Sequence, residues 1–433
     1  MANEYSRPLF DSETMRRVRN VFFWVDADPE SGERIFFENA GGSFRLKAAV
    51  EAKAHYEELP DCPERTHARA LELIAVQKKA ADDILRVICG SSDAVLDCAL
   101  TASQLNFKLA EVLADNLQGK NIVTTALEHP SVFDAAQYVA GKTGKELRVA
   151  PANPITGGID TEEIVKLVDG ETCFLSVMYA SNISGAVMDI GAIVREARKR
   201  KPDLFVICDA VQHAMHGVLN MDELGVDALV FAPYKFFCTR GAGYAALSPR
   251  LAALRHPRLA GKKADVWELG SPTPSNFAAL SAVVDYVISL GSLPETADRR
   301  DRFVSGMEAI RTQETALFER LLFGAGGQKG LLEIPGVNVL WYDGDLSRKD
   351  LIIGITIRGL DCAKAVSAYA QEHITVYERV RSSLYSVRML EALQIQGCIR
   401  ISPLHCNSEE EVIRFLAVTE RIAGNAQRLA EPV

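Results

Sequence analysis

The chain has 433 residues, of which 48% are hydrophobic and 24% charged, and its formal net charge is −9. This composition is typical of a globular protein and excludes an intrinsically disordered chain. The acidic balance argues against nucleic-acid binding, which usually needs a clustered basic surface. The basic run 195–201 ends a helical pattern, where cations complement the helix dipole.

The nine cysteines include no CxxC pair, so we expect no disulfide framework and no metal site. The first ten residues lack an apolar run, and no segment has the apolar length of a transmembrane helix. We therefore expect no signal peptide, no membrane association and a cytoplasmic location.

Short apolar runs alternate with longer amphipathic stretches through the middle of the chain. The predicted strands are 121–125, 172–179, 204–208, 228–231 and 242–247, and the predicted helices between them include 131–141 and 190–201. This alternation indicates an α/β fold with a mainly parallel sheet covered on both faces. Ligands bind such sheets at the carboxyl ends of the strands.

The pattern changes after residue 290. A helix is predicted over 297–323, strands over 336–342, 354–357 and 399–402, and further helices over 362–372 and 408–429, the last with Ser408 as its N-cap. We expect three parts: an N-terminal segment 1–30 that packs on the small domain, a large domain 31–295 and a small α+β domain 296–433.

The stretch from Asp209 to Lys235 carries the strongest chemical signal. Asp209 follows one predicted strand, Gln212 lies one turn later, and Lys235 follows the next strand. A buried carboxylate needs a cation such as a protonated pyridine nitrogen, and a desolvated lysine becomes an imine-forming nucleophile. Taken singly, such an aspartate more often caps a helix and such a lysine is more often exposed. Their joint spacing indicates a pyridoxal-phosphate (PLP) site with Lys235 as the Schiff-base lysine.

Over about residues 35–425 the chain resembles the fold-type I PLP enzymes, in particular the class V aminotransferase group that includes cysteine desulfurases. Seven motifs carry the resemblance, and they occur in the same order as in that family. They are 37–42 (FENAGG), 101–106 (TASQLN), 128–129 (EH), 181–185 (SNISG), 209–235, 268–272 (ELGSP) and 400–411. The resemblance implies a mostly parallel seven-stranded sheet in a large domain, a smaller α+β C-terminal domain, PLP as cofactor, and a homodimer with shared active sites.

The resemblance also implies roles for individual residues. The catalytic set is Lys235, His129 and Asp209. The cofactor-binding set is Ala102, Ser103, His129, Asn182, Asp209, Gln212, Tyr234, Lys235 and, from the neighbouring subunit, Ser271. Asn39 and Ala40 lie at the substrate mouth, and Arg400 clamps the substrate carboxylate. A purely structural role remains an alternative for several of these residues: Ser103 as a helix cap, His129 as a core histidine, Asn182 as a turn residue, Ser271 as a loop residue, and Arg400 as part of a structural ion pair.

The chain departs from the family pattern in two places. The common SGHK is Ala232-Pro233-Tyr234-Lys235 here, so the Tyr234 hydroxyl would replace a missing serine at the phosphate. The loop 378–386 holds no cysteine where desulfurases carry their nucleophile, and Cys398 and Cys406 are unsuited to that role. Arg379 and Arg381 in this region are either ligands for an extra anionic group or solvated side chains.

These observations favour lyase- or epimerase-type carbanion chemistry at the Cα of a small amino acid. An aminotransferase and a cysteine desulfurase with an atypical thiol are the alternatives. A catalytically silent binding protein is disfavoured, because Asp209, Gln212, Lys235 and Arg400 are all present.

Overall fold

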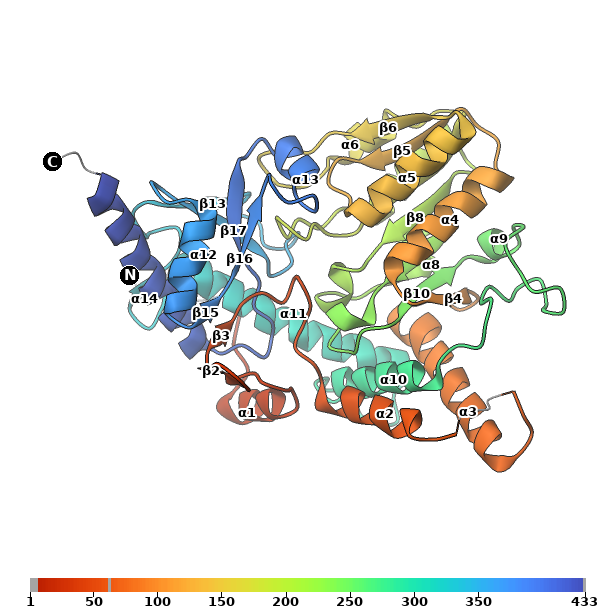
Figure 1. The fold of residues 1–433 in the computed structure, drawn as a ribbon, viewed down its shortest axis with the longest axis horizontal. Coiled ribbons are helices and arrows are strands. Elements are labelled where there is room, and N and C mark those ends of the chain that lie inside the picture. The colour runs from red at the N-terminus through yellow and green to blue at the C-terminus, as the bar shows by residue number, and fades with distance from the viewer. Residues whose placement is uncertain (1–6, 61–63, 431–433) are drawn as a thin grey trace.

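A seven-stranded sheet forms the centre of the computed structural model, which describes residues 7–60 and 64–430 (Figure 1). In spatial order its strands are β4 (Val95–Ala99), β10 (Gly243–Leu247), β9 (Ala228–Phe231), β8 (Phe205–Asp209), β7 (Thr172–Met178), β5 (Asn121–Thr125) and β6 (Glu146–Ala150). Strand β10 runs antiparallel to both of its neighbours, β4 and β9, and the other neighbouring pairs in this sheet are parallel. The expected mostly parallel seven-stranded sheet is therefore confirmed, although β4 and β6 were not among the predicted strands.

The sheet is covered on both faces because its central strands are apolar on both sides. Every residue of β5, β7, β9 and β10 is buried. The surrounding helices are α2 (Lys47–Glu57), α3 (Ala68–Asp82), a π-helical turn 83–88, α4 (Ala102–Asn116), α5 (Pro130–Thr143), α6 (Thr161–Val165), α7 (Ile190–Arg200), α8 (Met221–Leu224), α9 (Pro249–Ala252) and α10 (Pro274–Ile288). Helices α4 and α5 pack against one face, and α7 and α10 contribute to the core on the other.

A second, four-stranded antiparallel sheet lies in the C-terminal part of the chain. Its order is β13 (Val337–Leu340), β14 (Ile353–Ile357), β17 (Gly397–Ile401) and β16 (Tyr377–Val380). The helices of this part are α11 (Arg299–Phe323), α12 (Cys362–Gln371), α13 (Val387–Ala392) and α14 (Glu409–Ala430), and β11 (Gly324–Ala325) pairs with β12 (Gln328–Lys329). Residues of α11, α12 and α14 share a separate apolar core with this sheet.

The N-terminal segment contacts residues far along the chain. Helix α1 (Ser12–Asn20) is capped by Asp11, and β1 (Ala27–Asp28) pairs with β2 (Gly32–Glu33). Arg19 donates to the Cys406 carbonyl at 2.8 Å and pairs with Glu411 at 2.9 Å. Strand β3 (Ile35–Phe36) pairs in parallel with β15 (Ile374–Thr375). The division at residues 30 and 295 stays a prediction, and residues 1–6 of its first segment lie outside the described residues.

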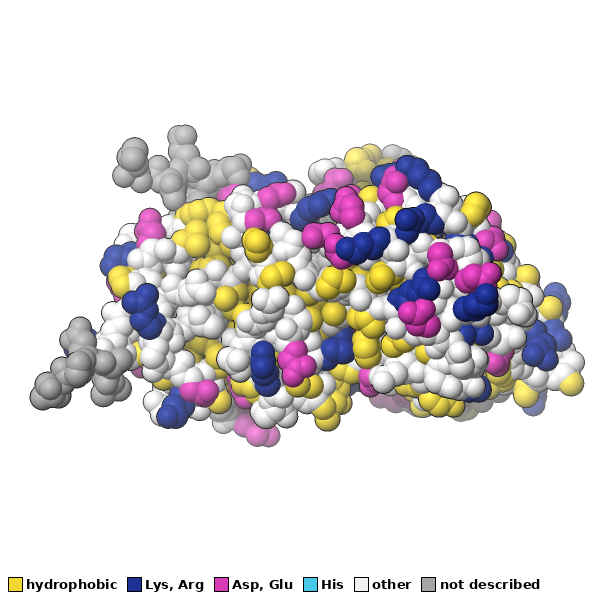
Figure 2. All heavy atoms as spheres, turned by 90° about the horizontal axis from the view of Figure 1, so that it is seen from above, with side chains coloured by type: hydrophobic (Ala, Val, Ile, Leu, Met, Phe, Trp, Pro, Cys, Tyr) yellow, Lys and Arg dark blue, Asp and Glu magenta, His cyan; other side chains and the backbone are white. Residues whose placement is uncertain are grey.

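The surface carries charges of both signs. In Figure 2, Lys and Arg side chains alternate with Asp and Glu side chains over the face seen from above and form no stripe of one sign. None of the helices in the described part combines the length and apolar character that crossing a membrane requires.

Candidate active site

Asp209 and Lys235 lie at the same edge of the sheet because they follow the carboxyl ends of adjacent parallel strands. Asp209 is the last residue of β8, and Lys235 ends a 3₁₀ turn (Pro233–Lys235) directly after β9. Both line a cavity of about 550 Å³ at the carboxyl edge of the sheet. The Nζ of Lys235 donates to the Oε1 of Gln212 at 3.1 Å. The remaining predicted cofactor ligands that line this cavity are Ala102, Ser103, His129, Asn182 and Tyr234.

Burial shifts both ionisable groups toward their neutral forms. It lowers the pKa of Lys235 to about 8, with a further contribution from the nearby Arg400 guanidinium. Burial also raises the pKa of Asp209, whose Oδ1 accepts from the Val211 amide at 2.9 Å and whose Oδ2 accepts from Asn106 at 3.4 Å. Lys235 is the nearby positive charge that acts on this carboxyl group.

The N-terminus of α4 borders the cavity. Thr101 caps this helix by accepting from the Gln104 amide at 3.2 Å, and the first turn presents Ala102 and Ser103 to the cavity. Amides at a helix N-terminus suit a phosphate group. Gly243 permits this placement, because a Cβ there would lie 2.4 Å from the Ala102 nitrogen. Tyr234 also lines the cavity, and the Arg240 guanidinium lies 4.2 Å from the centroid of its ring.

His129 caps α5 and borders the cavity. Its Nδ1 accepts from the Ser131 amide at 3.2 Å, and the Ser131 hydroxyl lies 2.8 Å from the same atom. Burial, together with nearby cations, lowers the pKa of His129 to about 4, so the ring is neutral near pH 7. A neutral, oriented imidazole is suited to packing against an aromatic cofactor.

Arg388 in α13 forms hydrogen bonds with the loop that precedes His129. Sequence reasoning did not identify this role. Its guanidinium donates to the carbonyl of Ala126 and, at 2.5 Å, to that of Glu128, and it lies 3.9 Å from the centroid of the Phe133 ring. The adjacent Glu128 carboxyl is fully buried, and burial raises its pKa to about 8. No local pattern marked Arg388, because its partners lie more than 250 residues away.

Arg400 lies in β17 and forms an ion pair in this structure. It donates to the Asn182 carbonyl at 2.7 Å and to Glu38 Oε1 at 2.6 Å. Arg400 therefore forms a structural ion pair, which was the alternative to its role as a carboxylate clamp. It also lies close enough to Lys235 to affect the charge of that residue. Sequence reasoning assigned no role to Glu38, although this residue lies inside the 37–42 motif, directly before Asn39.

Arg379 and Arg381 occupy different surroundings. Arg379 is 6% exposed, donates to the Tyr385 carbonyl at 2.8 Å and contributes to the positive potential at Lys235. Burial, reinforced by Arg400, lowers the pKa of Arg379 to about 10. Arg381 instead donates through its Nε to the Ile395 carbonyl at 3.1 Å.

Asn39 and Ala40 are buried in contacts with the segment after Arg400. The Asn39 amide donates to the Ser402 carbonyl at 3.1 Å, and its oxygen accepts from the Phe44 amide at 3.2 Å. The Ala40 amide donates to the Ser402 hydroxyl at 3.0 Å. These bonds hold the 37–42 loop against β17 and so bring Glu38 to Arg400.

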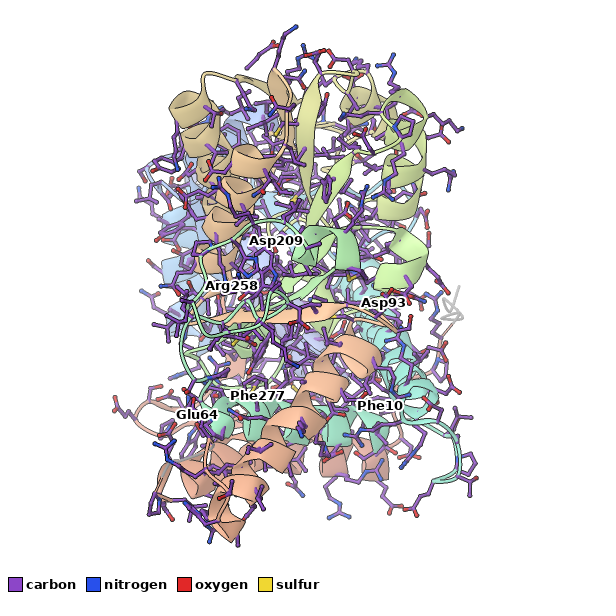
Figure 3. The ribbon with its side chains drawn as sticks, turned by 90° about the vertical axis from the view of Figure 1, so that its right-hand side faces the viewer. Phe10, Glu64, Asp93, Asp209, Arg258 and Phe277 are labelled. Carbon is purple, nitrogen blue, oxygen red and sulfur yellow. The ribbon has the colours of Figure 1, made fainter. Side chains whose placement is uncertain are left out.

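Ser271 lies apart from the cavity of its own chain. Its side chain is exposed and donates to Glu64. In Figure 3, Glu64 is well separated from Asp209, which marks the strand end at the cavity. The chain itself therefore does not bring Ser271 to the remaining predicted cofactor ligands.

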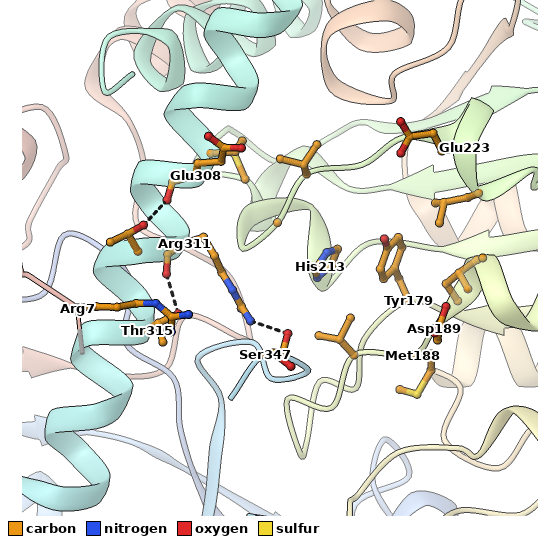
Figure 4. A pocket seen from close by; sticks show the side chains of 18 residues that line it. Arg7, Tyr179, Met188, Asp189, His213, Glu223, Glu308, Arg311, Thr315 and Ser347 are labelled. Atoms are coloured by element: carbon orange, nitrogen blue, oxygen red, sulfur yellow. Dashed lines mark hydrogen bonds between the residues drawn. The ribbon is translucent and has the colours of Figure 1, made fainter. Parts of the chain in front are cut away.

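His213, the residue next to Gln212, lines a second cavity of about 650 Å³ (Figure 4). His213 stacks on Tyr179 with 4.2 Å between ring centroids, and its Nδ1 lies 3.0 Å from a carboxylate oxygen of the buried Asp350. Arg311 borders the same cavity and lies 3.4 Å from Asp350. Consecutive residues of one motif thus serve two separate cavities.

No cysteine lines the active-site cavity in the described part of the chain. Cys398 lies in β17 with no exposed surface, and burial raises the pKa of its thiol to about 12. Cys406 is equally buried, with its pKa also raised. Cys62 lies outside the described residues.

The residues present fit pyridoxal phosphate. The Nε2 of Gln212 is buried without a hydrogen-bond partner in the described structure, so it can donate to a ring oxygen. The Asp209 carboxylate suits a protonated pyridine nitrogen, and the amides at the α4 N-terminus suit a phosphate group. A cavity of about 550 Å³ suits a cofactor of this size.

Comparisons with known proteins agree with this geometry. A cysteine desulfurase of Yersinia pestis (strain Pestoides F) is 31% identical over 305 residues, which cover 65% of this chain and 73% of that protein. A probable cysteine desulfurase of Xylella fastidiosa (strain Temecula1) is 23% identical over 433 residues, covering 95% and 96% of the two chains. An apo cysteine desulfurase structure from Thermococcus onnurineus NA1 shares the fold, with a TM-score of 0.79, 21% identity, and 95% and 98% coverage.

A family model described as aminotransferase class-V matches residues 35–415, a span that contains the whole seven-stranded sheet and every residue that lines the cavity. The chain therefore belongs to the class-V aminotransferase family, whose members are enzymes that use pyridoxal phosphate.

Proposed function

We propose that this enzyme acts at the Cα of a small amino acid, with lyase- or epimerase-type chemistry. The observation that carries the proposal is the buried Lys235, 3.1 Å from Gln212 and in the same cavity as Asp209, with no cysteine among the described residues that line the cavity. A desulfurase needs a thiolate that can reach the substrate sulfur. A proton transfer at the Cα of an amino acid attached to the cofactor needs a basic group such as Lys235 and no thiol.

Pyridoxal phosphate, when bound, withdraws electrons from the Cα of an amino acid attached to it. Lys235 would hold the cofactor, Asp209 would keep its ring nitrogen protonated, and the α4 N-terminus with Ser103 would bind its phosphate. The lowered pKa of Lys235 lets its Nζ both accept and return a proton near neutral pH. Arg400 would orient the substrate carboxylate.

The test is proton exchange at Cα in deuterated water with single amino acids, combined with mass analysis of the products. We expect deuterium at Cα, or a keto acid and ammonia, with at least one small amino acid. Lys235→Ala should abolish both. Absence of exchange and of any product with every amino acid tested would contradict the proposal.

Cysteine desulfuration is the second candidate, because the relatives above carry that name. It predicts conversion of cysteine to alanine with sulfur passed to a protein thiol. Cys398→Ser and Cys406→Ser separate the candidates: sulfur transfer that disappears in either variant would favour desulfuration. Formation of pyruvate from cysteine in both variants would favour the lyase.

Members of this family are typically homodimers that act on amino acids. We propose that Ser271, which lies apart from its own cavity, completes the site of a second subunit. Sedimentation of the holoenzyme as a dimer and weaker cofactor retention in Ser271→Ala are expected. A fully active monomer would contradict this arrangement.

A further inference from the structure

Two buried guanidiniums lie near Lys235, and one of them, that of Arg400, pairs with the carboxylate of Glu38. Arg379 and Arg400 are 6% and 2% exposed, and Glu38 pairs with Arg400 at 2.6 Å. Both arginines lower the pKa of Lys235 through their positive charge, and Glu38 raises it through its negative charge. The three side chains therefore form one charge group close enough to Lys235 to act on its amine, although none of them is among the residues that line the cavity.

Strand register explains why the two arginines are neighbours. In the β16–β17 pair, Tyr377 lies opposite Arg400, and Arg379 lies opposite Cys398. Residues two apart on a strand share a face, as do directly opposed residues. Arg379 and Arg400 are therefore diagonal neighbours on one face of the small sheet.

This charge group has unused hydrogen-bonding capacity. The Nε atoms of Arg379 and Arg400 and the Oε2 of Glu38 are buried without a hydrogen-bond partner in the described structure. Buried polar atoms of this kind normally have partners, so an incoming polar group is expected at the donors. The 2.6 Å contact with Arg400 is the ion pair of a charged Glu38 carboxylate. Burial raises the pKa of this carboxyl, and Arg400 and Arg379 offset part of that rise.

Arg379 and Arg400 are the two arginines whose charges act on Lys235. Arg388 contacts the Ala126 and Glu128 carbonyls, Arg381 contacts the Ile395 carbonyl, and Arg240 stacks on Tyr234. His129 is neutral at pH 7 because its pKa is lowered to about 4. The charge of the carboxylate subsite is thus +2 from the arginines and −1 from Glu38, which leaves +1.

We infer that Glu38 is a specificity-determining residue that restricts the substrate to amino acids with a single carboxylate. One carboxylate cancels the remaining positive charge, whereas a second would be desolvated beside Glu38 without a counter-ion. Arg379 is then needed because Glu38 already neutralises Arg400. This inference rests on the proposed function, in that it takes this subsite to receive the substrate carboxylate.

Binding of carboxylic acids that lack an amino group tests the charge count without any reaction. The probes are propionate and succinate, titrated calorimetrically into the cofactor-loaded protein. We expect propionate to bind about tenfold more tightly than succinate, the size of one charge-assisted hydrogen bond. Glu38→Gln should reverse that preference, because it raises the charge of the subsite to +2.

The double variant Glu38→Gln/Arg379→Gln returns the charge to +1 and should restore the preference for propionate. Glu378→Gln is the matched control, because Glu378 lies opposite Ile399 on the other face of the sheet. It should leave both affinities unchanged. If Glu38→Gln does not fold, Arg379→Gln, which lowers the charge of the subsite to zero, should weaken succinate more than propionate, and an unchanged ratio would overturn the charge count.

An unchanged propionate-to-succinate ratio in Glu38→Gln, or no recovery in the double variant, would overturn the inference. Failure of the proposed function would look different: amino acids would show no exchange at Cα while the two acids still bound in the expected ratio. The two failures are therefore distinguishable.

Discussion

The Nζ of Lys235 lies 3.1 Å from the Oε1 of Gln212, although 23 residues separate them along the chain. Gln212 follows β8 and Lys235 follows β9, and these neighbouring strands are parallel. The contact orients the amide so that its Nε2, which is buried and has no partner in the described structure, remains available as a donor. One strand pair thus supplies the attachment point and a polar contact for the cofactor.

Reduction with borohydride should attach the cofactor to one lysine only. Lys349 is a useful internal comparison, because burial lowers its pKa to about 8 as well, while its Nζ donates to the Thr156 carbonyl at 2.7 Å outside the cavity. Peptide mapping of the reduced holoenzyme should locate the label on Lys235 and leave Lys349 unmodified. A label on Lys349 would show that a low pKa, and not the cavity, selects the site.

Cofactor capture by the apoenzyme should depend on pH through Lys235. Its pKa is lowered to about 8, so the nucleophilic neutral amine increases as pH rises through about 8. The rate at which the visible absorption band appears should follow that midpoint. Arg400→Gln should move the midpoint upward, since it removes a nearby positive charge. A rate that is flat between pH 6 and 9 would refute the assignment.

The same shift affects stability with a definite sign. The folded pKa of Lys235, about 8, lies below its ordinary value of 10.5, so the unfolded chain binds more protons between these two values. The free energy of unfolding of the apoenzyme should therefore gain a contribution from Lys235 as pH rises from 8 to 10.5. Comparing Lys235→Met with the unchanged chain by urea titration across this range isolates that contribution, which should be absent in the variant.

Arg388→Met should loosen the loop that carries His129. The two bonds from its guanidinium to backbone carbonyls would be lost, at a cost of about 2 kcal/mol in the free energy of unfolding. Turnover should fall more than cofactor affinity, because the ring histidine loses its position. Arg414→Met is the control: this arginine pairs with the exposed Glu33, and such surface pairs contribute about 0–1 kcal/mol. Equal losses in the two variants would argue against a positioning role.

A buried ion pair between His216 and Glu314 should stabilise the fold over a limited pH range. Their side chains meet at 2.7 Å, the pKa of Glu314 is lowered to about 2, and that of His216 is raised. The Glu314 contribution is present above pH 4.5 and is lost as pH falls toward 2. The His216 contribution is present below pH 6.5 and is lost as pH rises through its elevated pKa.

Glu314→Gln should therefore lower the free energy of unfolding most between pH 4.5 and 6.5, by about 3 kcal/mol, because it leaves a buried charge without its partner. Urea titrations of both proteins at several pH values provide the measurement. A difference that does not change with pH would show that the pair contributes through packing alone.

Local patterns were sufficient for much of the fold. The apolar runs at 121–125 and 228–231 became β5 and β9 with the expected bounds, because buried strands need uninterrupted apolar sequence. Strand β6 was missed because its residues are mostly exposed or half-buried at the sheet edge. The antiparallel direction of β10 was also missed, since strand direction follows from connections and not from local composition.

The sequence by itself determined that Asp209 and Lys235 lie at one sheet edge, because each follows a strand and parallel strands end on the same side. Only the tertiary structure decided which charges meet there. Glu38 and Arg400 are 362 residues apart, and Arg388 and Ala126 are 262 apart. These pairs depend on how the two sheets and the N-terminal loop pack together, so no local spacing along the chain encodes them.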